Sequence, residues 1–168
     1  MVLPAEFDPA QYYLAAHDPA SGGYVVVAYQ HGADELAQNL EVARQLMRWG
    51  ERIVLLAAVP GQRSPDALRN GEIWEFKRLS HAKNIPRAIE KSLLQKKGQA
   101  TQFVLHIQQP YSLEHVARGL HKAVCNSQPE HLAVVAMLFP DNNLATLTRS
   151  QLEQKDFAAL KKRRADAP

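Results

Sequence analysis

The dipeptide Asn70-Gly71 constrains this chain more than any other short feature, because it predicts a two-residue turn that joins the two strands of a β-hairpin over residues 67–77. A turn of this length fixes which residues face each other across the hairpin. The predicted pairs are Arg69 with Glu72, Leu68 with Ile73, Ala67 with Trp74, and Asp66 with Glu75. The hairpin is therefore expected to place two acidic residues, Asp66 and Glu75, opposite each other.

The two opposed carboxylates predict a metal site. Like charges that face each other destabilise a sheet unless a cation lies between them. Alternation along the strands puts Asp66, Glu75 and Lys77 on one face. Oxygen ligands with room for water are what Mg²⁺ or Mn²⁺ prefers. The alternative is a solvent-exposed hairpin whose charged face is simply wet, with Lys77 neutralising the surroundings of Glu75.

The order of the other segments predicts an α/β fold with a mixed central sheet flanked by helices. A length of 168 residues with 46% hydrophobic residues suits a single domain over 1–168. The expected elements are a strand pair at about 10–30, a helix from Asp34 to Gly50, a strand at 53–59, the hairpin, a helix from Asn84 to Gly98, strands at 103–107 and 132–139 around a helix at 113–124, and a polar helix from Ser150. A basic tail at about 158–168 follows.

Several classes of protein are excluded by composition. Cys125 is the only cysteine, so neither an internal disulfide nor a cysteine-based zinc cage is expected. The longest apolar runs, 53–59 and 132–139, are far shorter than a membrane-spanning helix. Acidic residues near the N-terminus argue against a secretory signal there.

Basic residues gather directly after the hairpin. The segment 77–97 holds seven Lys or Arg and one acid, Glu90, so it carries +6 whereas the whole chain carries +3. Arg87, Lys91 and Gln95 recur every four residues and are expected on one helical face. Such a face suits a phosphate backbone, the alternative being an ordinary solvated helix. The predicted nucleic-acid-binding residues are Arg78, Lys83, Arg87, Lys91 and Gln95.

Two levels of family resemblance rest on these residues. Pro65-Asp66 followed by Glu75-Phe76-Lys77 resembles the motif of the PD-(D/E)xK nuclease superfamily. The stretch SPDALRNGEIWEFKR, followed by a basic helix, QA and FVLHI, resembles the C-terminal nuclease toxin domains of bacterial contact-dependent growth inhibition CdiA proteins. The resemblance covers about 32–149 and implies a core of order α-β-β-β-α-β behind the N-terminal strand pair.

The resemblance also implies roles for individual residues. Asp66, Glu75 and the main-chain carbonyl of Phe76 would bind the metal, Mg²⁺ or Mn²⁺. Lys77 would orient the attacking water and stabilise the charge that develops. His81, four residues after Lys77, is a candidate for protonating the leaving group, the alternative being a plain loop histidine.

The superfamily often adds an acid from the helix before the hairpin. An inward stripe through Leu36, Leu40, Ala43 and Met47 is predicted from the apolar spacing. Asn39 lies nearest the edge of this stripe and Glu35 next, so these two are the candidates. An asparagine in this position has one charge fewer than an acid and suits a single metal ion.

The expected function is metal-dependent hydrolysis of phosphodiester bonds. The resemblance implies an RNA-cleaving antibacterial toxin domain with tRNA as the first substrate. A DNA endonuclease of the same fold and a catalytically silent nucleic-acid-binding or protein-binding module are the alternatives. A toxin domain would be secreted as part of a larger protein, act in the target-cell cytoplasm and be neutralised by a cognate immunity protein; otherwise a cytoplasmic location is expected.

Overall fold

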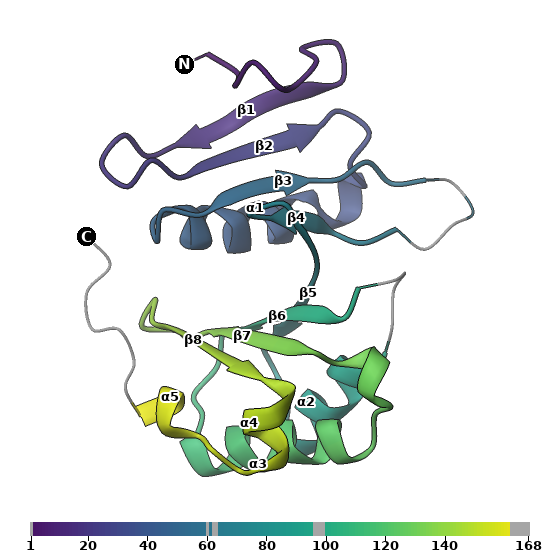
Figure 1. Ribbon diagram of the computed structural model, residues 1–168, viewed down its shortest axis with the longest axis vertical. Helices are drawn as coiled ribbons and strands as arrows, with labels where there is room; N and C mark the ends of the chain where they lie inside the picture. The colour runs from purple at the N-terminus through teal and green to yellow at the C-terminus, as the bar shows by residue number, and fades with distance from the viewer. Residues whose placement is uncertain (1, 60, 62–63, 96–99, 162–168) are drawn as a thin grey trace. The chain divides into compact units, whose positions relative to one another are not determined.

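The computed structural model describes residues 2–59, 61, 64–95 and 100–161 (Figure 1). Among these, the residues up to Trp74 form one compact unit and those from Glu75 onward form a second. Each unit is described by itself. The expected α/β class with a mixed set of strands is confirmed. That both units belong to a single domain over 1–168 stays a prediction, as does a PD-(D/E)xK core.

The first unit pairs its strands in chain order. It contains β1 (Tyr12–His17), β2 (Tyr24–Ala28), α1 (Ala33–Met47), β3 (Arg52–Leu55), β4 (Ala67–Arg69) and the first residues of β5 (Glu72–Leu79). β2 and β3 run parallel, whereas the other neighbouring strands run antiparallel. α1 connects β2 to β3 and packs against both (Figure 1). The predicted strand pair at 10–30 is therefore confirmed, and its second strand joins the sheet of the hairpin.

The inward face predicted for the first helix is wrong, because a neighbouring face of the helix is the buried one. The buried residues of α1 are Asn39, Val42, Ala43 and Leu46. Leu36, Leu40 and Met47 are only half-buried. The helix carries apolar residues on two adjacent faces, and the face that points inward is the one on which Asn39 has a hydrogen-bonding partner. The N-cap is Gly32, two residues before Asp34, where the helix was expected to begin.

The second unit contains a parallel β5, β6 and β7 with β8 antiparallel at the end. Its elements after β5 are α2 (Ile85–Leu94), β6 (Gln102–Ile107), α3 (Leu113–Cys125), the 3-10 turn η1 (Pro129–His131), β7 (Val134–Leu138), β8 (Leu144–Thr148), α4 (Arg149–Glu153) and α5 (Ala158–Lys161). Alternate residues of β6 and β7, such as Phe103, Leu105 and Met137, share one core with Ile89 of α2 and Leu120 of α3. Two short helices thus replace the single polar helix predicted from Ser150.

The basic helix α2 is positioned by a cap and by a close contact. Asn84 Oδ1 accepts a hydrogen bond from the main-chain N–H of Arg87 at 3.1 Å, so Asn84 is the N-cap and the predicted start of this helix is confirmed. A Cβ added to Gly119 of α3 would lie 2.9 Å from Cα of Pro86, so α2 and α3 approach at backbone distance. The predicted end at Gly98 is wrong because α2 ends at Leu94, and residues 96–99 lie outside the described part.

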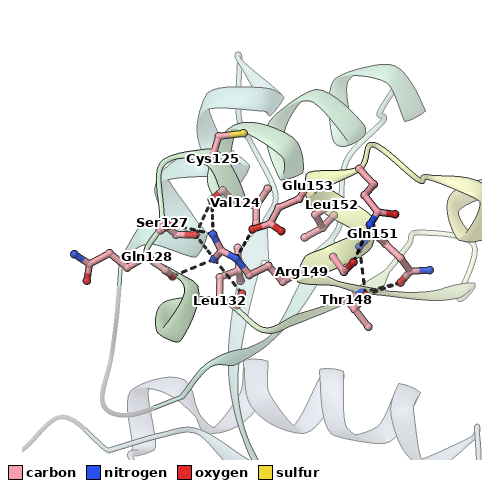
Figure 2. A network of polar contacts seen from close by, with 12 residues as sticks. Val124, Cys125, Ser127, Gln128, Leu132, Thr148, Arg149, Gln151, Leu152 and Glu153 are labelled. Carbon is pink, nitrogen blue, oxygen red and sulfur yellow. Dashed lines mark hydrogen bonds and ion pairs between the residues drawn. The ribbon is translucent and has the colours of Figure 1, made fainter.

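One arginine fastens the C-terminal end of α3 (Figure 2). Arg149 donates through Nη2 to the carbonyls of Val124 and Ser127, both at 3.1 Å. Through Nη1 it donates to Ser127 Oγ at 3.1 Å and to the Gln128 carbonyl at 3.0 Å. Its Nε pairs with Glu153 at 2.6 Å. Because the last carbonyls of a helix lack partners within the helix, Arg149 adds charged donors at this end of α3, where Ser127 Oγ also donates to the Val124 carbonyl.

Candidate functional site

The hairpin has the turn and the register that its sequence predicts. Asn70 and Gly71 both adopt positive φ, 52° and 88°, as a two-residue hairpin turn requires. β4 and β5 pair Arg69 with Glu72, Leu68 with Ile73 and Ala67 with Trp74. Asn70 also ties the turn to β3, because its side-chain oxygen accepts from the N–H of Arg52 at 2.9 Å. The expected pair of Asp66 and Glu75, one step further, falls on either side of the division between the units and stays a prediction.

A cluster of Arg69, Glu51 and Trp74 stabilises the hairpin in the first unit. Arg69 is almost fully buried and its guanidinium grips both carboxylate oxygens of Glu51. The same guanidinium lies 4.3 Å from the centre of the Trp74 ring, a cation–π contact. Its planar fork is suited to both contacts at once. Through this cluster, Arg69 at the end of β4 contacts Glu51, which directly precedes β3.

Glu75 and Lys77 form an ion pair on β5 in the second unit. The Glu75 side chain is fully buried and the Lys77 side chain is 12% exposed. Lys77 Nζ contacts Glu75 Oε1, as their shared face on the strand predicts. A buried charge is costly unless it is paired, so the ammonium stabilises the ionised carboxylate. The alternative of a solvent-exposed charged face is therefore wrong for Glu75, which is buried. The part of that alternative in which Lys77 neutralises the surroundings of Glu75 is confirmed.

Asp66 is also buried, with 5% of its surface exposed. It directly precedes β4, and its main-chain carbonyl accepts from the N–H of Leu56 at 3.1 Å. This bond continues the antiparallel pairing of β3 and β4 by one residue beyond Leu55 and Ala67. The backbone of Asp66 is thus held by the segment that follows β3.

Of the two candidates on the first helix, only Asn39 is buried. It is 6% exposed, whereas Glu35 is exposed on the outer side of α1. Asn39 Nδ2 lies 3.1 Å from Nε2 of His31, and Nδ1 of His31 lies 2.6 Å from the carbonyl oxygen of Leu56. A polar chain therefore runs from Asn39 through His31 and Leu56 to Asp66, entirely within the first unit.

His31 is the residue that the sequence did not single out. It follows β2 and precedes α1, and no metal-ligand or catalytic spacing marks it. Its partners, Asn39 and the carbonyl of Leu56, are 8 and 25 positions away. The one available signal is its position just after a strand of a parallel pair, the edge at which ligands bind in many α/β proteins.

The predicted nucleic-acid-binding residues are all exposed in the second unit. They are Arg78 on β5, Lys83 before α2, Arg87 and Lys91 on α2, and Gln95 directly after it. Arg87 and Lys91 share a helical face, whereas Gln95 is the C-cap with an extended backbone and so is wrong as the third member of a helical stripe. Glu90 accepts from Asn126 Nδ2 at 2.5 Å, so the one acid of the segment is engaged at the end of α3. Lys96 and Lys97 lie outside the described residues.

The remaining candidate, His81, is exposed in the turn between β5 and α2. The residue after it is fixed, because Gln109 bonds both the N–H and the carbonyl of Ala82, at 2.6 Å and 3.0 Å. Over the described ranges, no three side chains from His, Cys, Asp and Glu gather as a group that could hold a metal ion.

No helix in the described part of the chain is long and apolar enough to cross a membrane. This finding agrees with the short apolar runs of the sequence.

Comparison with known proteins finds two similarities. Among the solved structures, a toxin and immunity complex from Burkholderia pseudomallei, CdiA-CT/CdiI, contains a chain that is 19% identical, with a TM-score of 0.49, and the match covers 68% of this chain and 85% of that one. No curated protein matches. Residues 63–144, just under half of the chain and including the hairpin and α2, match the family model of the contact-dependent growth inhibition CdiA C-terminal domain. In that segment the chain is similar to the C-terminal domain of CdiA proteins.

Proposed function

We propose that this chain is an antibacterial toxin domain that hydrolyses phosphodiester bonds in RNA, with tRNA as its first substrate and Mg²⁺ or Mn²⁺ as its cofactor. One observation carries the proposal: a fully buried glutamate, Glu75, paired with Lys77 on the strand of an acidic hairpin. The match of residues 63–144 to the CdiA C-terminal family supports the reading as a toxin.

The donor set fits a hard divalent cation. Asp66 and Glu75 offer carboxylate oxygens and Phe76 offers its main-chain carbonyl, and Mg²⁺ is commonly held by one or two carboxylates while it keeps several waters. This set contains only two carboxylate side chains. The proposal requires the β4–β5 register to continue by one pair beyond Ala67 and Trp74, so that Asp66 faces Glu75.

Each residue of the proposed site would have a separate role in hydrolysis. A bound cation would stabilise the negative charge that develops on the phosphate. Lys77 would orient the attacking water, whose oxygen bonds to phosphorus as the bond to the leaving 3′ oxygen breaks, giving a 5′-phosphate and a 3′-hydroxyl. His81 would supply a proton to the leaving oxygen. Arg78, Lys83, Arg87, Lys91 and Gln95 would hold the backbone of the nucleic acid.

The similarity to CdiA C-terminal domains supports two further parts of the proposal. The domain would reach the target-cell cytoplasm as part of a larger secreted protein. A cognate immunity protein would bind it and neutralise it.

The test is incubation of the purified protein with total tRNA and with plasmid DNA, each with Mg²⁺ and with a chelator. We expect loss of tRNA only when Mg²⁺ is present. Asp66→Asn and Glu75→Gln should each abolish cleavage. Glu72→Gln is the matched control, because Glu72 lies on the same hairpin and is exposed.

Each other outcome has a defined meaning. Metal-dependent loss of plasmid alone would move the substrate to DNA. Binding of tRNA in a mobility shift, with no cleavage of either substrate, would replace the enzyme by a silent binding module. Full cleavage by Asp66→Asn or Glu75→Gln would show that the proposed site is wrong.

A further inference from the structure

A hollow of ≈ 500 Å³ opens in the second unit, just beyond the carboxyl ends of the parallel strands β6 and β7. It is lined by Gln108, Gln109, Pro110, Tyr111 and Leu113 after β6 and by Pro140 after β7. The carboxyl ends of parallel strands are where ligands bind in many α/β proteins. The volume lies within the range of small-molecule sites. The hollow therefore has the position and the size of a ligand site.

Hydrogen bonds hold both walls of the hollow in place. On one side, the Gln109 side chain bonds the main-chain N–H and the carbonyl of Ala82, in the turn that leads from β5 to α2. On the other side, the N–H of Phe139 donates to the carbonyl of Asn143 at 3.0 Å and closes the turn that contains Pro140. The walls are thus formed before any ligand binds, which reduces the entropic cost of binding.

The aromatic ring of Tyr111 lies in the lining and is supported from behind. Its centre is 5.0 Å from that of the Phe139 ring, and the two planes are inclined by 31°. Phe139 is fully buried, whereas Tyr111 is half-buried. Among the described residues that line the hollow, none is charged. A fixed aromatic ring in an uncharged hollow suits a neutral, planar group that can stack on it.

Positive charge lies beside the hollow rather than inside it. Ala82, which Gln109 holds, has His81 and Lys83 as its neighbours in the chain, and both are exposed. An exposed lysine next to an uncharged hollow matches the two parts of a nucleotide, which are a neutral base and an anionic phosphate. The charge distribution therefore points to a nucleotide unit as the occupant.

We propose that this hollow binds one unstacked nucleobase of a single-stranded nucleic acid, with Tyr111 as the stacking platform and Lys83 as a contact to a phosphate of the same strand. The inference rests on the proposed function and deepens it. Proteins recognise single-stranded loops of RNA by stacking their bases on aromatic side chains. Leu79 at the end of β5 pairs with Ile107 next to the hollow and lies roughly 13 Å along the strand from Glu75. The bound base is therefore near the cleaved phosphate, not at it.

The test measures binding of a fluorescein-labelled oligouridine of about 12 nucleotides to the full chain. A chelator is present, so that no metal-dependent cleavage takes place. Tyr111→Leu should weaken binding by about 5- to 150-fold, the effect of losing one base–aromatic stack, and Tyr111→Phe should stay within about threefold of the parent. Melting temperatures check the fold of both variants. A Tyr111→Leu variant that binds as tightly as the parent would overturn the inference.

Two controls separate stacking from charge. An abasic chain of the same length keeps the phosphates but has no bases, so Tyr111→Leu should change its affinity by less than about twofold. An equal loss for both probes would overturn the inference. Lys83→Met should weaken both probes and reduce the slope of log affinity against log salt concentration by about 1, whereas Tyr111→Leu should leave the slope unchanged. A Lys83→Met variant with an unchanged slope would overturn the phosphate contact.

A second measurement needs no substitution. Oligouridine that contains 4-thiouridine is crosslinked to the parent by light, and the crosslinked peptide is identified by mass spectrometry. We expect a peptide with Tyr111 or Pro140, and crosslinks confined to α2 would overturn the inference. Uridine monophosphate should compete only weakly, because it lacks the rest of the strand. Competition equal to that of unlabelled oligouridine would assign the hollow to a free nucleotide instead.

Failure of this inference can be told apart from failure of the proposed function. If oligouridine binding depends on Tyr111 but neither tRNA nor plasmid DNA is cleaved with Mg²⁺, hydrolysis fails and the base site stands. If tRNA is cleaved and Tyr111→Leu binds and cleaves as the parent does, only the base site fails. A parent that binds no oligouridine at all would overturn the inference directly.

Discussion

Replacing Lys77 by methionine removes the cation that contacts a fully buried carboxylate, at nearly constant side-chain volume. The structure sets the size of the effect, because Glu75 has no exposed side-chain surface and Lys77 only 12%. Breaking a buried ion pair by removing one partner costs about 3–5 kcal/mol, and the residual exposure of Lys77 favours the lower end. A loss of about 3 kcal/mol should lower the melting temperature by roughly 6–12 °C in a chain of this size.

The assay is urea denaturation followed by circular dichroism, with thermal melting alongside it. Lys91→Met is the matched control, because Lys91 is exposed on α2 and its loss should change the free energy of unfolding by no more than about 0.5 kcal/mol. The double variant Glu75→Gln with Lys77→Met should regain most of the stability, since no charge is then left buried. A Lys77→Met variant as stable as Lys91→Met would refute this account of the pair.

The same variant links stability to the proposed metal. In Lys77→Met, Mn²⁺ would take over the neutralisation of Glu75, and a ligand at 100 times its dissociation constant stabilises the folded state by about 2.7 kcal/mol. The melting temperature of Lys77→Met should therefore rise with Mn²⁺, and the rise should vanish when Glu75→Gln is added. A rise that persists in the double variant would mean that Mn²⁺ binds elsewhere.

Two further predictions concern single residues. Arg149→Met should lower the free energy of unfolding by about 3 kcal/mol in urea denaturation, because the carbonyls at the end of α3 lose a charged donor. Arg149→Lys should restore less than half of that loss, since lysine lacks the planar guanidinium. An Arg149→Met variant within about 0.5 kcal/mol of the parent would contradict this. The pKa of Tyr24 is raised above its usual 10.0, first by burial and then by Glu6, which accepts its hydroxyl hydrogen. The stability that the protonated phenol contributes should accordingly be complete below about pH 10 and fall as pH rises through the higher folded value; absorbance titration of the phenolate should show Tyr24 titrating earlier in Glu6→Gln, and an unchanged titration would contradict the role of Glu6.

Local signals in the sequence were sufficient for the hairpin and for the start of α2. Asn70-Gly71 fixed three residue pairs because a two-residue turn leaves only one register. Asn84 followed by Pro86 marked the cap of α2 because both residues act within one helical turn. In each case the residues that decide the structure are neighbours in the chain.

Long-range contacts account for what the sequence did not predict. Hydropathy favoured the face of α1 with Leu36 and Leu40, yet Asn39 is buried because His31 gives it a partner. His31 in turn depends on the carbonyl of a residue 25 positions later. Neither contact leaves a periodic trace, so apolar spacing alone could not place them.

The bonds of Arg149 set a practical limit on fragments of the second unit. The segment similar to the CdiA family stops at residue 144, whereas Arg149 and nearly all of β8 come after it. A polypeptide cut at that boundary would leave β7 without its antiparallel neighbour and the carbonyls of Val124 and Ser127 without their guanidinium. An open strand edge of this kind promotes aggregation. A soluble fragment that carries α2 and its basic residues should therefore extend at least through Glu153, which pairs with Arg149.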